Sequence, residues 1–163
     1  MKVACIQIST KDNIDKNVKK LISLINEAIK RKSDLIITPE ASTILTDDKK
    51  LLLKKSFRMA DDPFLKQVSQ ISKKHKKWIL IGSIFIKENN ILINRSIIFD
   101  KNGKIANYYD KINMFDVKLP NGENYNESKY FKAGSKIKTV DLPWGKLGMT
   151  ICYDLRFPEL YRK

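Results

Sequence analysis

Hydrophobic positions along the chain follow two different periods. Apolar and polar residues alternate from Lys2 to Ile8, which predicts a first strand with Val3 and Cys5 buried. A stripe at helical spacing follows, and we expect Asp12 or Asn13 to cap this helix. Its apolar positions are Ile14, Val18, Leu21, Ile22, Ile25, Ala28 and Ile29. The chain therefore begins with a strand followed by an amphipathic helix.

A short segment centred on residues 35–37 is apolar on both faces, which is typical of a buried parallel strand. Pro39 ends this strand because proline lacks a backbone donor and restricts Thr38 to extended geometry. The sequence thus places Glu40 at the carboxyl end of a buried strand. In α/β sheets, functional side chains gather at these ends.

The rest of the chain is rich in strands. Asp61-Asp62-Pro63 predicts a helix start, and that helix runs to about Lys76. Further strands are expected at 78–86, 91–99, 105–109, 137–142 and 146–151, with a hairpin signal at Asn102-Gly103. Residues 112–136 are polar and irregular, and a loop of that length is usually functional or poorly ordered. This order of elements predicts a layered α/β domain.

Composition narrows the class of protein. The 163 residues are 42% hydrophobic and 31% charged, as in a folded globular domain. No apolar run is long enough to span a membrane, and the start of the chain does not resemble a signal peptide. The two cysteines, Cys5 and Cys152, are far apart, which favours a reducing cytoplasm over a disulfide framework.

The formal net charge of +14 raises the question of an anionic partner. The excess is mostly lysine spread along the chain, without an arginine-rich arm or alternation of basic and aromatic residues. We therefore expect a solvated, lysine-rich surface and neither a nucleic-acid nor a membrane partner. A basic nucleic-acid-binding protein stays as an alternative, which would show salt-sensitive binding.

Cys152 is the first candidate for chemistry. It follows the apolar segment 148–151 at a sharp turn before a helix start. A thiol at that position would be exposed and close to backbone N–H groups, which favours the thiolate form. The sequence thus predicts a nucleophile at Cys152, whereas Cys5 on the first strand is expected to be an ordinary core thiol.

Elimination suggests what could assist this cysteine. The only histidine, His75, is flanked by lysines at a helix end and is expected at the surface, so a Cys-His pair and a zinc site are both disfavoured. The base must then be a carboxylate and the positive partner a lysine or arginine, and Glu40 and Lys111 each follow a predicted strand. Each residue alone also fits an ordinary role, as a helix-start acid or a solvated lysine. Asp154 and Arg156 are expected to pair and brace the turn.

Three segments together carry a resemblance. Pro39-Glu40-Ala41-Ser42, the stretch from Tyr109 to Asp116 and the stretch from Gly148 to Glu159 resemble the three signatures of the nitrilase, or carbon–nitrogen hydrolase, superfamily. The resemblance implies an α/β fold, the nitrilase-type α-β-β-α sandwich. It also implies that Glu40 is the general base, Lys111 the oxyanion stabiliser and Cys152 the nucleophile. Glu127 matches a fourth residue frequent in the family, a second glutamate in the loop between the lysine and the cysteine.

Within the superfamily, residues 115–128 and 152–160 are most similar to Nit-type amidases, which include deaminated glutathione amidases and ω-amidases. This implies cleavage of a small carboxylate-bearing monoamide to an acid and ammonia through a cysteine thioester, without a cofactor or metal. It places Tyr153, through its backbone N–H, and Asn113 at the substrate. Asn113 departs from the histidine usual in this branch.

Length is the larger departure, because family members continue well beyond the cysteine. The resemblance implies that residues 1–163 form a single carbon–nitrogen hydrolase domain that is incomplete at its C-terminus. Three interpretations stay open. The chain is part of an enzyme that works as a homo-oligomer or with a complementing C-terminal chain, or it is a truncated inactive remnant, or it is the basic nucleic-acid-binding protein considered above.

Overall fold

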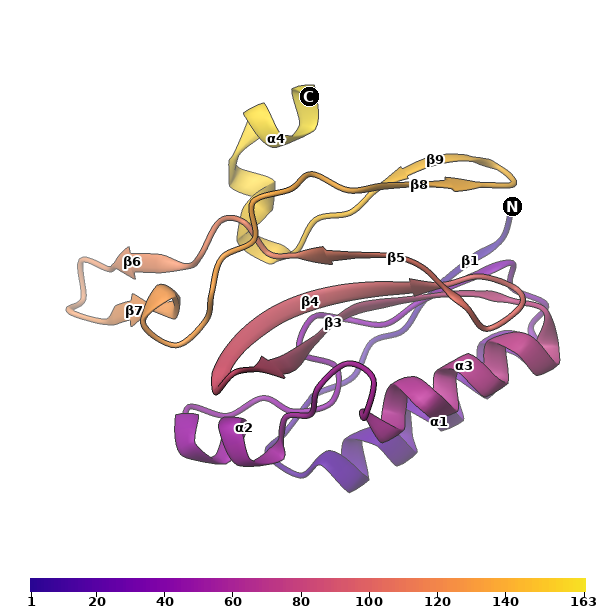
Figure 1. Cartoon of the computed structure of the whole chain (residues 1–163), viewed down its shortest axis with the longest axis horizontal. Coiled ribbons are helices and arrows are strands. Elements are labelled where there is room, and N and C mark those ends of the chain that lie inside the picture. Colours follow the sequence, from indigo (N-terminus) through magenta and orange to yellow (C-terminus); the bar gives the residue numbers. More distant parts are fainter.

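The computed structural model describes all residues from Met1 to Lys163. Its centre is a five-stranded mixed sheet in the order β1-β2-β3-β4-β5 (Figure 1). The first three strands are parallel and the last three are antiparallel. These strands are β1 (Val3–Cys5), β2 (Leu35–Ile37), β3 (Trp78–Glu88), β4 (Ile91–Phe99) and β5 (Ile105–Asp110).

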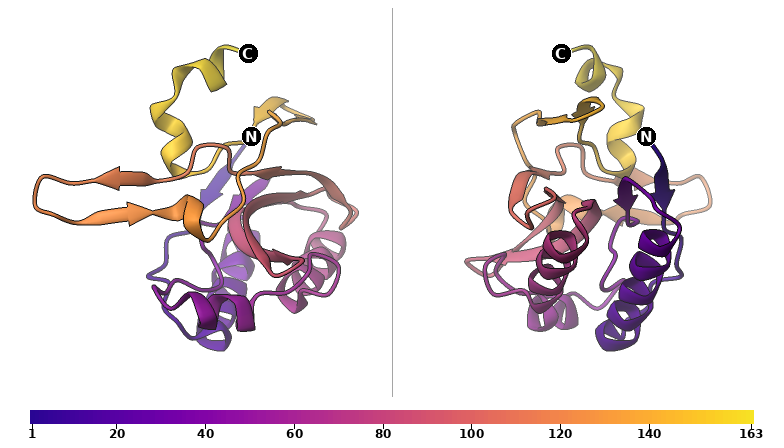
Figure 2. Two further views of the ribbon diagram at one scale, coloured as in Figure 1. Left: turned by 60° about the vertical axis from the view of Figure 1, so that its left-hand side comes forward. Right: turned by 90° about the vertical axis from the view of Figure 1, so that its right-hand side faces the viewer.

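Two long helices cover one face of this sheet, α1 (Ile14–Lys30) and α3 (Pro63–His75). They run side by side beneath the strands, as the right-hand view of Figure 2 shows. The sequence sets their starts, because Asn13 and Asp62 accept hydrogen bonds from backbone N–H groups of the first turns. Their apolar stripes pack on the sheet in a core that includes Leu21, Ile25, Val68, Ile36, Ile81 and Ile97.

The opposite face of the sheet is covered only in part. The hairpin of β8 (Thr139–Leu142) and β9 (Gly145–Gly148) contributes to a second core with Ile98 and Tyr109. Beyond the hairpin, the outward positions of β1 stay open. The expectation that Val3 and Cys5 are buried is therefore wrong, since Val3 is 40% exposed and Cys5 is exposed as well. Alternation in β1 marks two faces of a strand, but only one of them has a covering layer.

The segment 112–136 is more ordered than its sequence suggests. It forms a two-stranded ribbon, β6 (Asp116–Lys118) and β7 (Asn124–Asn126), which projects from the body of the molecule (Figure 2). A 3₁₀ turn, η1 (Glu127–Lys129), returns the chain to the sheet. A short helix that the pattern did not predict, α2 (Lys49–Lys55), lies between β2 and α3 in the chain.

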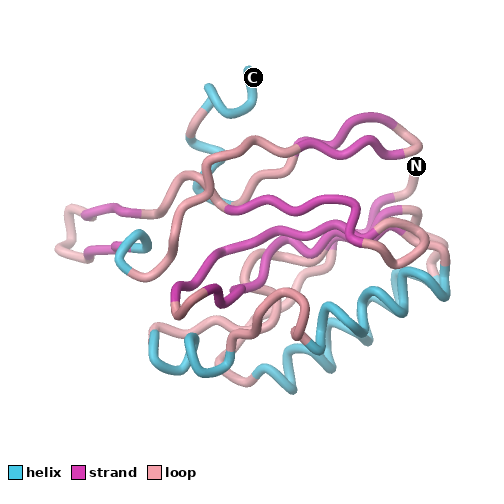
Figure 3. The backbone as a smooth tube through the Cα atoms, viewed as in Figure 1, coloured by secondary structure: helices cyan, strands magenta, loops and turns pink.

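The strand predicted before Cys152 is shorter than expected. β9 ends at Gly148, and residues 149–151 continue without strand pairing into a 3₁₀ helix, η2 (Cys152–Arg156). The last helix, α4 (Pro158–Arg162), follows on the side of the sheet away from α1 and α3, as Figure 3 shows in cyan. None of the helices has the length and apolar character that crossing a membrane requires.

Candidate active site

Glu40 is held in a tight loop that directly follows β2. Ala41 next to it has a φ of +49°, which is unusual for a residue with a side chain. The Ala41 N–H donates to Ser83 Oγ at 2.9 Å, and Ser83 lies in the irregular part of β3 between Ile81 and Ile84. The loop that presents Glu40 is therefore fixed by the neighbouring strand.

Asn94 of β4 orients the Glu40 carboxylate. Its Nδ2 donates to Glu40 Oε1 at 2.8 Å, and the asparagine side chain is buried. The other end of the amide, Oδ1, has no hydrogen-bond partner within the protein. A buried amide is costly unless it has a hydrogen-bonding role, and here its Nδ2 fixes the direction of an acid.

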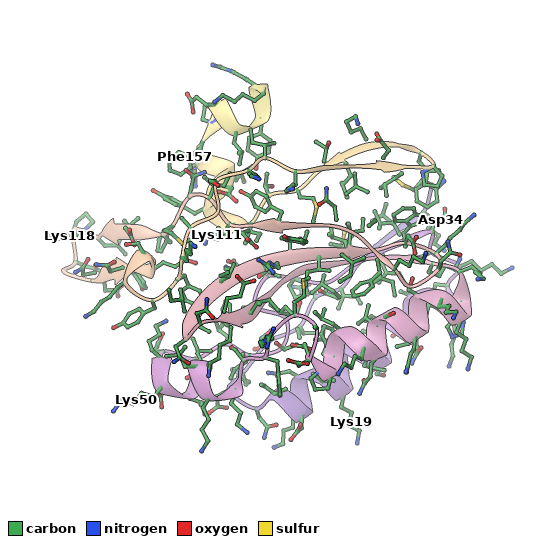
Figure 4. All side chains as sticks on the ribbon, viewed as in Figure 1. Lys19, Asp34, Lys50, Lys111, Lys118 and Phe157 are labelled. Atoms are coloured by element: carbon green, nitrogen blue, oxygen red, sulfur yellow. The ribbon has the colours of Figure 1, made fainter.

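Lys111 lies directly after β5, with its side chain only 2% exposed. Its backbone N–H donates to the Asn94 carbonyl at 3.0 Å, so β4 places Lys111 and orients Glu40. The Nζ atom donates to the Glu127 carboxylate at 2.8 and 3.1 Å and lies 3.5 Å from Glu40 Oε1. In Figure 4 Lys111 sits between the sheet and the base of the ribbon.

The ammonium of Lys111 stays charged despite its burial. Burial by itself disfavours the charge, but the hydrogen bond to Glu127 and the negative charges of Glu40 and Glu127 outweigh it and raise the pKa of Lys111. Glu127 also accepts from the Phe115 N–H at 2.7 Å, which anchors this carboxylate at the foot of the ribbon. The irregular region 112–136 thus supplies the main counter-charge of the lysine.

Cys152 lies near this cluster, since the charges of Glu40, Lys111 and Glu127 all act on its thiol. It is the first residue of η2, is exposed, and has a φ of +48°. A positive φ in a residue with a side chain is a strained geometry of the kind found at functional turns. The predicted exposure of this thiol at a sharp turn agrees with the structure.

The expectation that Cys152 is a thiolate does not agree with the structure. Burial, followed by the negative charge of Glu40, raises the pKa of the Cys152 thiol, and the opposing effect of Lys111 is smaller. The expectation of a thiolate rested on backbone N–H groups near the thiol and left out the two carboxylates. Two carboxylates, Glu40 and Glu127, share the single ammonium of Lys111, so a further negative charge on the thiol is disfavoured.

Asp154 holds the turn of Cys152 against the strand of Lys111. It is fully buried, and each carboxylate oxygen accepts two hydrogen bonds of 2.7–2.9 Å. The donors are the Tyr109 hydroxyl, the Ile151 N–H, and both the backbone and side-chain N–H groups of Asn113. The predicted bracing role of Asp154 is confirmed, but pairing with Arg156 is wrong because the two form no ion pair.

Two residues placed at the substrate by resemblance have other contacts here. The Asn113 amide is engaged with Asp154. The Tyr153 ring packs edge-on against Phe115 and Phe157, with centroids 5.0 and 5.3 Å apart. Neither residue lines the cavity beside Glu40.

A cavity of about 470 Å³ opens beside Glu40, Lys111 and Glu127. This volume suits a small metabolite. Cys152 does not line this cavity. Within the cluster, the charge of Glu40 has the largest effect on its thiol. The remaining wall comes from α2 and the loop before it, from strands β3, β4 and β7, and from the segment around η1. Its residues include Leu45, Asp47, Lys49, Phe85, Asn94, Tyr125, Tyr130 and Phe131.

Histidine, cysteine and acidic side chains form no group of three that could hold a metal ion. The nearest acids, Glu40 and Glu127, instead share the Lys111 ammonium. The site brings an acid, a thiol and an ammonium together, groups that can transfer protons and stabilise negative charge.

Comparison with solved structures finds the same architecture in larger proteins. The Caenorhabditis elegans NitFhit protein superimposes with a TM-score of 0.87 at 29% identity, over 97% of this chain and 39% of that one. Nit3 of Saccharomyces cerevisiae, described as a member of branch 10 of the nitrilase superfamily, gives a TM-score of 0.82 at 27% identity. Its structure is covered over 58% of its length, and this chain over 98%. The expected nitrilase-type α/β fold is thereby confirmed.

Sequence comparison leads to the same group. A deaminated glutathione amidase of Dictyostelium discoideum is 32% identical over 95% of this chain and 56% of its own length. The omega-amidase NIT3 of S. cerevisiae is 33% identical over 98% of this chain and 57% of its own length. The chain thus spans about half the length of these relatives. The family model for carbon-nitrogen hydrolases matches residues 2–163, and the chain therefore belongs to the carbon–nitrogen hydrolase family.

Proposed function

We propose that this chain carries the catalytic centre of an amidase, which converts a small carboxylate-bearing monoamide to an acid and ammonia. The observation that carries the proposal is the meeting of Glu40, Lys111 and Glu127 in one hydrogen-bonded cluster, with Cys152 close enough for the charges of Glu40 and Lys111 to act on its thiol. The relatives named deaminated glutathione amidase and omega-amidase support the substrate class.

Glu40 acts as the general base in the first step. It takes the proton of the Cys152 thiol as the sulfur attacks the amide carbon. Because the thiol and Glu40 exchange one proton, the charge of the cluster does not change during this transfer. The raised pKa of Cys152 supports a mechanism in which the thiolate forms only when an electrophile is present.

Lys111 and the Tyr153 N–H stabilise the negative oxygen that develops on the amide carbon. Lys111 suits this role because it is buried and keeps its charge. Protonated Glu40 then gives its proton to the departing nitrogen, so ammonia leaves and a thioester to Cys152 remains. Water attacks the thioester with Glu40 again accepting a proton, which releases the carboxylic acid and restores the thiol.

Glu127 holds Lys111 in place throughout the cycle. Its two oxygens both contact the ammonium, and the Phe115 N–H fixes its position. We assign Glu127 a positioning role. Without it, Glu40 would be the only carboxylate paired with Lys111, and this ion pair would compete with proton transfer from the thiol to Glu40. The mechanism needs only these side chains and water, and a reducing cytoplasm would keep the thiol available.

We further propose that the active form carries additional protein over the open face of β1. Val3 and Cys5 on that face are exposed, and Leu155 and Tyr161 near Cys152 are 73% and 51% exposed. A second copy of the chain or a complementing C-terminal chain would cover them, and the NitFhit relative shows that the family also occurs fused to another domain. Intact mass and sedimentation of the protein from its native source distinguish these partners.

The test of the catalytic proposal is ammonia release, measured with the protein purified from its native source. A panel of ω-monoamides of four- and five-carbon dicarboxylic acids, including 2-oxo acids, serves as substrate. We expect release of one ammonia per acid formed, and none from the Cys152→Ala variant. Release that persists in Cys152→Ala, or no release from any monoamide, would refute the proposal.

A further inference from the structure

Lys49 is a cation in the cavity wall that the reaction does not use. It lies at the first position of α2, is half-buried, and lines the cavity with Glu40 and Lys111. Its Nζ lies 5.0 Å from the ring centroid of Tyr130 and 5.5 Å from that of Phe131. Contacts of this kind hold an ammonium in place without neutralising it.

The charges around the cavity distinguish Lys49 from Lys111. Lys111 is committed to Glu127 and Glu40, whereas no carboxylate lies within 4.0 Å of the Lys49 ammonium. The remaining charged group of the wall, Asp47, is exposed and forms no ion pair. Lys49 is therefore the one cation of the wall whose charge is free to pair with an incoming anion.

We propose that Lys49 binds the carboxylate of the substrate at the end remote from the amide. The inference rests on the proposed function, since it assumes that the amide carbon is placed between Cys152 and Lys111. A ligand with an amide at one end and a carboxylate at the other would then lie across the cavity, and its volume of about 470 Å³ accommodates such a molecule. The site thereby selects monoamides of dicarboxylic acids over neutral amides of equal length.

The chemistry of the wall agrees with this assignment. Tyr130 and Phe131 provide an apolar surface for the carbon chain and keep water from one side of the ammonium, which strengthens its pairing with an anion. A charge-assisted hydrogen bond between Lys49 and a carboxylate corresponds to about a tenfold gain in affinity. The predicted discrimination is thus between anionic and neutral ligands of the same shape.

The test measures binding without turnover. In protein carrying Cys152→Ala, succinamate and its neutral counterpart succinamide are titrated and followed by nuclear magnetic resonance. We expect succinamate to bind about tenfold more tightly, and we expect Lys49→Met to remove that preference while Lys49→Arg retains it. Lys50→Met serves as the matched control, because Lys50 is exposed at the outer edge of α2 (Figure 4) and should leave the preference intact.

Equal binding of the two ligands to the parent protein would overturn the proposal, as would a preference that survives Lys49→Met. Failure of the proposed function gives a different result. In that case, protein with Cys152 intact releases no ammonia, while the binding preference and its dependence on Lys49 persist. Circular dichroism of each variant confirms that the comparison is made between folded proteins.

Discussion

Lys111 is bound unequally by the two carboxylates that flank it. Its Nζ contacts both oxygens of Glu127, at 2.8 and 3.1 Å, but is 3.5 Å from Glu40. Glu127 therefore carries most of the pairing with the lysine. Glu40, whose side chain is 35% exposed and faces the cavity, stays available to exchange a proton with Cys152.

Replacing Glu127 tests this division of roles. In Glu127→Gln the buried ammonium loses its main counter-charge and turns to Glu40, so the base is withdrawn from the thiol. We expect ammonia release to fall about a hundredfold, as for loss of one oxyanion contact. The free energy of unfolding should drop by about 3 kcal/mol because a buried ion pair is broken.

Urea unfolding and ammonia release measure these two effects. Glu123→Gln on the same ribbon is the matched control, since Glu123 is exposed and its carboxylate accepts a hydrogen bond only from the Tyr125 hydroxyl. We expect that control to stay within about 0.5 kcal/mol of the parent protein. Equal behaviour of the two variants would show that Glu127 does not position Lys111.

The raised pKa of Cys152 predicts opposite effects of two neighbouring substitutions on thiol alkylation. Glu40→Gln removes a negative charge, so the thiol pKa falls and alkylation at pH 7.5 becomes faster. Lys111→Met removes a positive charge, so the pKa rises further and alkylation becomes slower. The two variants should therefore differ from the parent protein in opposite directions, Glu40→Gln faster and Lys111→Met slower.

Iodoacetamide labelling followed by peptide mass spectrometry measures the rate of Cys152 alkylation. The exposed Cys5 on β1 is an internal reference in the same sample, and its labelling rate should not depend on either substitution. In the parent protein, labelling of Cys152 should keep rising with pH beyond the range of an ordinary thiol. A plateau below that range would mean that a thiolate exists at rest, contrary to the mechanism.

Asp154→Asn tests the link between the turn of Cys152 and the strand of Lys111. All four groups around this buried carboxylate donate hydrogen bonds, and an amide can accept at only one of its two ends. We expect the free energy of unfolding to fall by about 1–3 kcal/mol, and catalysis to fall with it. Asp141→Asn in the exposed pair with Lys146 is the control and should have little effect in urea unfolding.

Gly82→Ala tests how the loop of Glu40 is supported. A Cβ at this position in β3 would lie 2.1 Å from the Thr38 carbonyl oxygen and 2.7 Å from the Pro39 carbonyl carbon. The backbone that presents Glu40 would have to move, so we expect a loss of about 1–3 kcal/mol and slower ammonia release. Gly148→Ala has open space around it and should be tolerated. Similar melting temperatures for the two variants would refute this account of the loop.

Elements with a strong local pattern could be predicted from the sequence. Residues 91–99 were expected as a strand and form β4 with those bounds, because nearly every apolar position there faces a covering layer. Asn13 and Asp62 similarly set the starts of α1 and α3 through local hydrogen bonds. Such features depend on residues close in the chain, which the sequence displays directly.

Features that depend on distant contacts were not predicted. Asn94 orients Glu40 from a different strand, and its only signal was the polar run Asn94-Arg95-Ser96 inside an otherwise apolar strand. The helix α2 was missed because its leucines are consecutive and show no helical period. The direction of the Cys152 pKa depends on how many carboxylates surround Lys111, which becomes visible only when the segments are brought together.

The most direct test of the central claim is the intact mass of the protein during turnover of an ω-monoamide, quenched in acid. The account predicts an adduct equal to the mass of the substrate minus ammonia, located on Cys152 by peptide mapping. The adduct should appear in the parent protein within the first turnovers and be absent from Cys152→Ala. Ammonia release without such an adduct, or undiminished release from Cys152→Ala, would contradict a thioester mechanism built on Glu40, Lys111 and Cys152.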